Sequence, residues 1–170
     1  MCNTDIFKNS LRIAADATLN STVDGPGIRY VIWTQGCPHH CFQCHNPMTH
    51  SSNGGYWKKM DEILEEIVSL EYHSGITLSG GEPFEQVDKL LYLLDHLPEH
   101  LSVWCYTGYT FEQLMKDERK KKMLEKIDVL VDGRFDVRKK TRKRFKGSDN
   151  QRIIDVKKSL EDKRIVLWEA

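Results

Sequence analysis

Three cysteines lie close together in the first third of this 170-residue chain, at Cys37, Cys41 and Cys44. Their spacing, C-x3-C-x2-C, brings three thiols onto one short segment. A [4Fe-4S] cluster has four irons, each normally held by one cysteine thiolate. The other two cysteines, Cys2 and Cys105, stand apart in the sequence. A cluster on this segment would therefore keep one iron open to a substrate or cofactor, as catalytic zinc keeps one vacant position.

The spacing alone leaves two other interpretations of the cysteines open. A structural zinc site could use the thiols together with His39, His40 or His45. The cysteines could also be ordinary buried thiols. Zinc sites usually combine two ligand pairs, and no second pair appears in this sequence. The pattern therefore favours a cluster and leaves zinc as the alternative.

A second candidate site is the segment Leu-Ser-Gly-Gly-Glu-Pro at 78–83, which we expect between a strand and a helix. Glycines let the backbone approach a ligand without a Cβ in the way. The carbonyl groups of such a loop can accept hydrogen bonds from an ammonium group. Taken alone, a glycine pair here favours a tight turn between a strand and a helix. Gly81 is the first residue that we expect at a ligand.

Short apolar runs alternate with amphipathic stretches along the chain. β-Branched and aromatic runs predict strands, and apolar residues at helical spacing predict helices. A capping box of Thr110 and Gln113 marks the start of the last helix. We expect strands at 28–33, 76–79, 102–107 and 127–131, helices at 60–70, 84–97 and 110–126, and strands or a strand plus a short helix at 151–156 and 164–168.

This alternation indicates an α/β fold in a single domain spanning residues 1–170. A closed barrel of eight βα units commonly takes about 250 residues, so we expect a partial, open (β/α)6-type barrel with mostly parallel strands. Ligands of such sheets bind at the carboxyl ends of the strands. The cysteine loop, the glycine pair, Thr107-Gly108 and Asp132-Gly133 all follow predicted strands and should share that edge. For Asp132 itself, the sequence favours a turn residue or a helix cap.

Composition narrows the function classes. Lys plus Arg equals Asp plus Glu, at 25 each, so no overall charge selects nucleic acid or a membrane surface. No apolar run approaches the roughly 20 residues that span a bilayer, and the N-terminus lacks a secretory pattern. We therefore expect a cytoplasmic protein, in which clustered thiols more often bind metal than form disulfides. The basic run Arg138–Arg144 favours a solvated loop, with docking to an acidic partner or to nucleic acid as alternatives.

Several motifs together resemble known families. The cysteine spacing and the Gly-Gly-Glu segment resemble the signatures of the radical S-adenosylmethionine (SAM) superfamily. DGPGIR at 24–29 and CHNP at 44–47 resemble elements of glycyl radical enzyme activases. VLVDGRF at 129–135 and FKGSDNQR at 145–152 resemble the activating proteins of anaerobic (class III) ribonucleotide reductases. Two residues depart from these patterns: Gln43 stands where an aromatic residue is common, and Lys146 stands where Arg is usual.

The resemblance implies a radical SAM core and an oxidoreductase. In such enzymes a [4Fe-4S] cluster reductively cleaves SAM, and the 5′-deoxyadenosyl radical takes a hydrogen from a glycine of a partner enzyme. The implied partners are the catalytic subunit of anaerobic ribonucleotide reductase and a one-electron donor such as flavodoxin or ferredoxin, without membrane or nucleic acid. No catalytic residue is implied beyond the three cluster ligands. The implied SAM contacts are Gln43, Cys44, His45, Gly80, Gly81, Glu82 and Asp132.

Two alternatives to this function remain at the level of sequence. One is a different radical SAM reaction, such as that of a pyruvate formate-lyase-type activase or a deazaguanine synthase. The late Gly-Ser-Asp-Asn-Gln element at 147–151 favours reductase activation over the synthase. The other alternative is a non-enzymatic zinc-binding module that uses the basic run to bind its partner.

Overall fold

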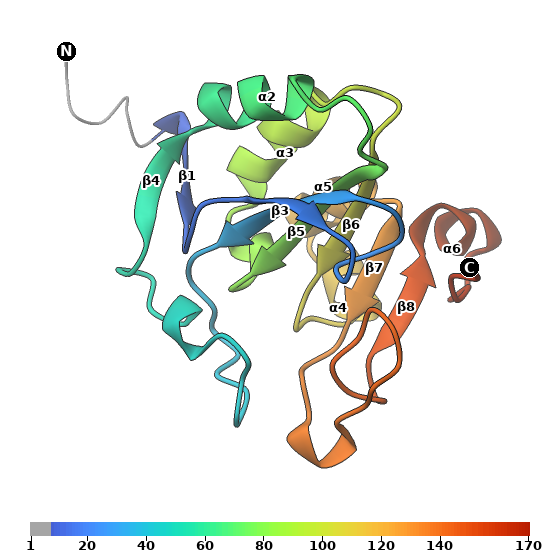
Figure 1. Ribbon diagram of the computed structural model, residues 1–170. Coiled ribbons are helices and arrows are strands. Elements are labelled where there is room, and N and C mark those ends of the chain that lie inside the picture. Colours follow the sequence, from blue (N-terminus) through green and yellow to red (C-terminus); the bar gives the residue numbers. More distant parts are fainter. Residues whose placement is uncertain (1–7) are drawn as a thin grey trace.

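The computed structural model describes residues 8–170, so Cys2 lies outside the described residues. These residues form one eight-stranded sheet with the order β4-β1-β3-β5-β6-β7-β8, and β2 pairs with β3 beside this path. Figure 1 shows the sheet as an open, twisted layer. The strands are β1 Ser10–Ile13, β2 Thr18–Ser21, β3 Arg29–Thr34, β4 Tyr56–Lys59, β5 Gly75–Gly80, β6 Ser102–Tyr106, β7 Val129–Asp132 and β8 Arg152–Asp155.

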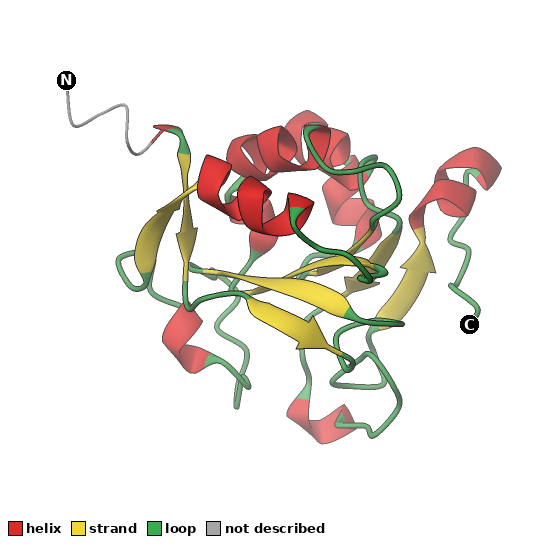
Figure 2. Ribbon diagram, turned by 45° about the horizontal axis from the view of Figure 1, so that its top comes forward, coloured by secondary structure: helices red, strands yellow, loops and turns green. Residues whose placement is uncertain are grey.

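Helices cover one face of this sheet. Figures 1 and 2 show α2, α3, α4 and α5 gathered on that side, with α6 beyond the far edge next to β8. The α-helices are α2 Met60–Val68, α3 Val87–Asp95, α4 Phe111–Met115, α5 Glu118–Leu124 and α6 Val156–Asp162, and the short 3-10 turns are η1 Pro47–Thr49, η2 Pro83–Glu85 and η3 Val137–Lys139.

The predicted α/β class is confirmed and the sheet is not closed, but the (β/α)6-type barrel is not confirmed and the prediction of mostly parallel strands is wrong. Strands β3, β5, β6 and β7 run parallel, which gives three parallel pairings. The four other pairings between named strands are antiparallel. Strands β1, β2 and β4 were not predicted; β2 is mostly exposed and β4 has no buried residue, so neither carries an apolar run in the sequence. Strand β8 returns antiparallel because no α-helix separates it from β7, and a parallel return needs a long crossover.

The two faces of the central strands pack differently. Side chains such as Ile32, Leu78 and Leu130 belong to the large apolar core under the helices. On the opposite, concave face, Trp104 and Val131 belong to a smaller cluster. Both faces are therefore buried along much of β3 to β7, which explains why these strands read as continuous apolar runs in the sequence.

The predicted helices are confirmed with one interruption. The Thr110 hydroxyl accepts a hydrogen bond from the backbone N–H of Gln113, and the Gln113 side chain accepts one from the backbone N–H of Thr110, so the capping box is present. The helix that it starts ends at Met115, however. Asp117 then caps a new helix, α5, because its carboxylate accepts from two backbone N–H groups of the following turn. The local preference of Asp117 for an N-cap thus divides the single helix predicted over 110–126.

The late segments also differ in part from the prediction. The run at 151–156 forms β8, whereas the run at 164–168 contributes only an isolated bridge between Leu167 and Ile154. The basic run is a loop, as expected, with the short turn η3 and a bridge between Lys140 and Ser148. Within residues 8–170, no helix has the length and apolar character needed to cross a membrane.

Candidate functional site

A cavity of about 270 Å³ opens at the carboxyl ends of the parallel strands, where the sequence places its four distinctive loops. It is bounded by the loops after β3, β5, β6 and β7 and by the segment before β8. The lining residues are Asp24, Trp33, Cys37, His39, Cys41, Cys44, His45, Asn46, Thr49, Ser79, Gly80, Gly81, Tyr106, Thr107, Gly108, Gly133, Phe135, Gly147 and Gln151.

All three clustered cysteines line this cavity as free, half-exposed thiols. The loop that carries them curls tightly, because His40 and Gln43 adopt positive φ angles of 46° and 54°. A backbone hydrogen bond of 3.1 Å from Cys44 to Cys41 closes its last turn. Burial raises the pKa of the Cys37 thiol, so a metal is needed to hold it as a thiolate at neutral pH.

The donor set fits a [4Fe-4S] cluster. Cys37, Cys41 and Cys44 face one cavity, and Cys105 is fully buried elsewhere in β6. Three thiolates can hold three irons and leave the fourth open. Among residues 8–170, no group of three or more His, Cys, Asp or Glu side chains is arranged around a single metal ion. A cluster does not require such convergence, because each of its thiolates binds a different iron.

The glycine pair lies directly against the base of the cysteine loop. A Cβ on Gly80, which has φ +96°, would lie 2.6 Å from the backbone of Thr34, and one on Gly81 would lie 2.4 Å from the carbonyl oxygen of Gly36. The backbone of Gly81 donates to Thr34 at 2.7 Å. Only glycine permits this approach. The predicted SAM contacts Gly80 and Gly81 therefore line the same cavity as the thiols.

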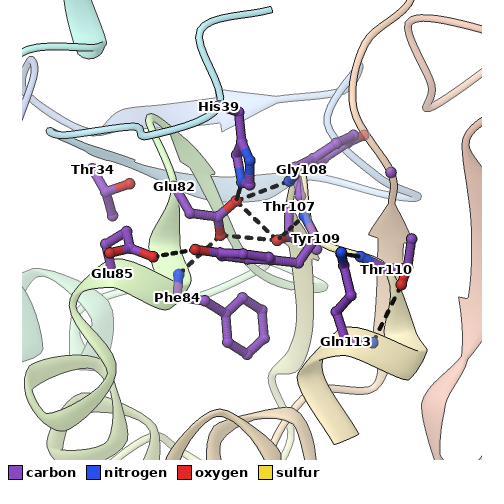
Figure 3. Close-up of polar contacts among 12 residues, drawn as sticks. Thr34, His39, Glu82, Phe84, Glu85, Thr107, Gly108, Tyr109, Thr110 and Gln113 are labelled. Atoms are coloured by element: carbon purple, nitrogen blue, oxygen red, sulfur yellow. Dashed lines mark hydrogen bonds and ion pairs between the residues drawn. The ribbon is translucent and has the colours of Figure 1, made fainter. Parts of the chain in front are cut away.

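Glu82, which we expected at SAM, is fully buried and directed away from solvent. Figure 3 shows its carboxylate among donors from three loops. It accepts from the backbone N–H groups of Phe84 at 3.0 Å and Gly108 at 2.8 Å. The Thr107 hydroxyl lies 2.9 Å from both of its oxygens, and Nε2 of His39 lies 2.7 Å from Oε2. Glu82 thus joins the loops around the cavity and is not among the residues that line it.

Two other expected SAM contacts also lie outside the cavity lining. Gln43 is exposed on the cysteine loop. Asp132 is buried, and its carboxylate accepts from the backbone of Phe111 at 2.8 Å and from Arg152 at 2.5 Å. Phe111 is the first residue of α4, so Asp132 caps that helix from the end of β7. This is the cap interpretation that the sequence favoured, and the adjacent Gly133 lines the cavity instead.

Replacing Asp132 with alanine is expected to lower the free energy of unfolding by about 2–4 kcal/mol, because Phe111 and Arg152 lose a buried acceptor. The affinity for SAM should change by less than about twofold among molecules that remain folded. Urea denaturation and equilibrium SAM binding measure the two effects. Asp88→Ala is the control, because the carboxylate of Asp88 is exposed and pairs with the exposed Arg119. A loss of SAM affinity at unchanged stability would contradict the cap role.

The late element contributes the far wall of the cavity. The Gln151 side chain accepts from the backbone of Gly147 at 2.8 Å and donates to the carbonyl of Gly133 at 3.0 Å. The rings of His45 and Phe135 lie 4.5 Å apart between their centroids. The segment that follows the third cysteine therefore packs against the segment that follows β7.

Sequence reasoning missed several residues of the site. His39 was considered only as a zinc ligand, yet its ring is bound to Glu82. Trp33 and Tyr106 line the cavity although neither was expected at a ligand, and Asp24, which also lines it, was noted only as part of the DGPGIR element. Trp33 and Tyr106 lie near the carboxyl ends of predicted strands, so their position was a usable signal. Nothing in the sequence indicated that His39 contacts Glu82, because 43 residues separate the two.

The fold defines an α/β protein whose cavity opens at the carboxyl edge of the parallel strands. Residues 23–154 match the family model described as a 4Fe-4S single cluster domain. The anaerobic ribonucleoside-triphosphate reductase-activating protein of Enterobacteria phage T4 is 35% identical over 139 residues, covering 77% of this chain and 86% of that protein. The protein of the same name from Vibrio cholerae is 34% identical over 122 residues, covering 66% and 77%. The pyruvate formate-lyase-activating enzyme of Listeria monocytogenes is 28% identical over 155 residues, covering 86% of this chain and 62% of that enzyme.

The chain belongs to the 4Fe-4S single cluster domain family and, within it, to the radical SAM activases of glycyl radical enzymes. The predicted enzyme class and the predicted cofactors, a [4Fe-4S] cluster and SAM, are thereby confirmed. The same comparisons decide against the zinc-binding module that the cysteine spacing had left open.

Proposed function

We propose that this enzyme cleaves SAM reductively and generates a glycyl radical on an anaerobic ribonucleotide reductase. The observation that carries the proposal is the single cavity, because it gathers the motifs that the resemblance singled out from distant parts of the chain. Three free thiols, the glycine pair, and both the Gly133–Phe135 and Gly147–Gln151 segments border it. Relatives named as reductase-activating proteins, 34–35% identical over 122–139 residues, support the choice of partner.

In this proposal the residues of the cavity divide into two groups. Cys37, Cys41 and Cys44 hold the cluster, and the backbone of Gly80 and Gly81 binds the amino group of SAM. When bound, the reduced cluster supplies the electron that cleaves SAM, and the organic radical released takes a hydrogen atom from the glycine. The protein orients the reactants and excludes water, and no acid–base pair is required. An acidic one-electron donor such as flavodoxin or ferredoxin supplies the electron.

Exposed apolar side chains beside the thiols support a protein substrate. Phe42 and Met48 lie on the cysteine segment with 75% and 88% of their surface exposed. Exposed apolar groups around a site are typical of surfaces that bind another protein. A glycine loop of a partner could thus reach the cavity while the partner covers these side chains.

Electron paramagnetic resonance on a defined mixture tests this function. Anaerobically reconstituted enzyme, SAM and a chemical reductant are mixed with purified anaerobic ribonucleotide reductase or with pyruvate formate-lyase. A glycyl radical signal is expected with the reductase and only in the presence of SAM. Cys41→Ala is the matched negative control. Absence of the signal with both partners, from enzyme that carries a full cluster, would contradict the proposal.

The second candidate is activation of a pyruvate formate-lyase. It is favoured by the relatives from Listeria, which are named for that activity and match 86% of this chain. A glycyl signal with pyruvate formate-lyase and none with the reductase would select this candidate. Both candidates use the same cavity and differ only in the partner that covers it.

A further inference from the structure

The side chain of His39 connects the cysteine loop to the glycine loop. It lies between Cys37 and Cys41 in the sequence, and its Nε2 is 2.7 Å from Oε2 of Glu82. Both side chains are almost fully withdrawn from solvent, with 4% and 0% of their surface exposed. Glu82 directly follows Gly80 and Gly81. The contact therefore joins the segment that carries the thiols to the segment that carries the glycine backbone.

Glu82 cannot follow a displaced His39, because its carboxylate is held from other directions. Phe84 binds Oε1 through its backbone within the same loop, and Gly108 binds Oε2 through its backbone from the loop after β6. The Thr107 hydroxyl lies between both oxygens. Figure 3 shows Phe84, Thr107 and Gly108 around the carboxylate together with His39. Because three other groups hold this buried carboxylate, its position is fixed, and it can in turn fix the position of the His39 ring.

The His39 ring is held from the sides as well. Its centroid lies 4.6 Å from that of Tyr109 in an edge-on contact. A Cβ on Gly108 would lie 2.3 Å from Cδ2 of His39, so the ring fills the space that only glycine leaves at this position. His40, the next residue, offers a natural comparison, because it is exposed and its ring lies near that of His50, at 4.9 Å between ring centroids.

The backbone hydrogen bonds between the cysteine loop and the glycine loop lie at the bases of the two loops. Glu82 donates through its backbone to Gly36 at 2.8 Å, and Gly81 donates to Thr34. Both acceptors precede the first cysteine. The His39–Glu82 pair extends this connection into the part of the loop between the first and second cysteines. Without it, the segment 37–44 would keep its three thiols and lose its fixed position relative to Gly80 and Gly81.

We propose that His39 and Glu82 are positioning residues that set the cysteine loop against the glycine loop and thereby determine the affinity for SAM. The inference rests on the proposed function, in which one SAM molecule is bound by groups on both loops. A ligand held at two places is bound tightly only if those places are fixed relative to each other before binding. The three thiols can still assemble a cluster when the pair is broken, because they lie on one continuous segment.

The test compares SAM affinity at equal cluster content. His39→Ala, His39→Gln and Gly108→Ala are reconstituted anaerobically beside the wild type and His40→Ala. Iron content and the electron paramagnetic resonance spectrum of the reduced cluster are recorded during titration with SAM. We expect His39→Ala and Gly108→Ala to hold iron like the wild type and to bind SAM about tenfold to a hundredfold more weakly. His40→Ala should match the wild type, and His39→Gln should recover part of the affinity because its amide can donate to Glu82.

Each result decides between the proposals. A wild type that carries its cluster and does not bind SAM contradicts the proposed function itself. Wild-type affinity in His39→Ala with full iron overturns the positioning role alone. If His39→Ala holds no iron, the SAM affinity of Gly108→Ala tests the positioning role instead, because its added Cβ displaces the His39 ring without removing it. Loss of iron from both variants, or full affinity in Gly108→Ala, overturns the positioning role too.

Discussion

Replacing Cys37, Cys41 or Cys44 with alanine is expected to remove the cluster and to abolish SAM cleavage. Each thiolate normally holds its own iron, so two remaining thiolates leave a second iron without a protein ligand. The three positions should behave alike, because all three thiols line the same cavity. Iron analysis after anaerobic reconstitution and the yield of 5′-deoxyadenosine measure the loss. Both quantities should fall to the background of a protein that received no iron.

Cys105→Ala is the matched control for these variants. Cys105 is fully buried in β6 and belongs to the apolar core under the helices, with its Sγ 3.7 Å from the carbonyl of Tyr106. Removing this sulfur should cost about 1 kcal/mol of stability through lost packing. Iron content and SAM cleavage per folded molecule should remain unchanged. Retention of the cluster in Cys41→Ala, or its loss in Cys105→Ala, would show that the ligand assignment is wrong.

Arg29→Met is expected to lower the free energy of unfolding by about 3–5 kcal/mol. Arg29 is fully buried at the start of β3, and burial lowers the pKa of its guanidinium to about 10, so it is still charged at neutral pH. It donates to the carbonyl oxygens of Ile76 and Ser102 and to the hydroxyl of Thr77. Methionine fills much of the volume and satisfies none of these acceptors. Urea denaturation measures the change.

An exposed arginine provides the comparison for Arg29. Arg142 lies in the basic run at the surface, so Arg142→Met should change stability by no more than about 0.5 kcal/mol. Arg29→Lys keeps the charge but loses the planar set of guanidinium donors. Its free energy of unfolding should therefore lie between those of the wild type and Arg29→Met. Equal stability of Arg29→Met and Arg142→Met would contradict the structural role of the buried guanidinium.

The buried position of Arg29 also explains the element DGPGIR at 24–29. The sequence showed that this element resembles one in the activases but gave no structural reason for it. A Cβ on Gly25 would lie 2.6 Å from Cδ of Arg29, and one on Gly27 would lie 2.0 Å from the hydroxyl oxygen of Ser74. The glycines let the chain fold closely over the arginine at the amino ends of the parallel strands. Arg29 and these glycines therefore support the sheet at the amino ends of its strands, whereas Asp24, the first residue of the element, lines the cavity.

Much of the catalytic apparatus could be predicted from the sequence because its geometry is local. The C-x3-C-x2-C spacing places Cys37, Cys41 and Cys44 on one segment whatever surrounds it. The Gly80–Gly81 pair and the capping box of Thr110 depend on backbone conformations that only a few residue types favour. The parallel strands were visible as apolar runs because both of their faces are buried. Since parallel strands end at one edge, the meeting of their loops followed from the order of elements alone.

The tertiary structure decided which side chains contact one another across these loops. His39 contacts Glu82, and Asp132 contacts Phe111 and Arg152. These partners are 20 to 43 residues apart in the sequence, so no sequence pattern indicates that they meet. Both carboxylates were expected at SAM; in the structure they hold loops and a helix around the cavity and do not line it. A buried carboxylate must be satisfied by donors wherever packing supplies them, and packing is a property of the assembled sheet edge. The sequence by itself thus determined the candidate cofactor ligands and the common edge at which they lie, whereas only the tertiary structure decided which residues hold the surrounding loops in place.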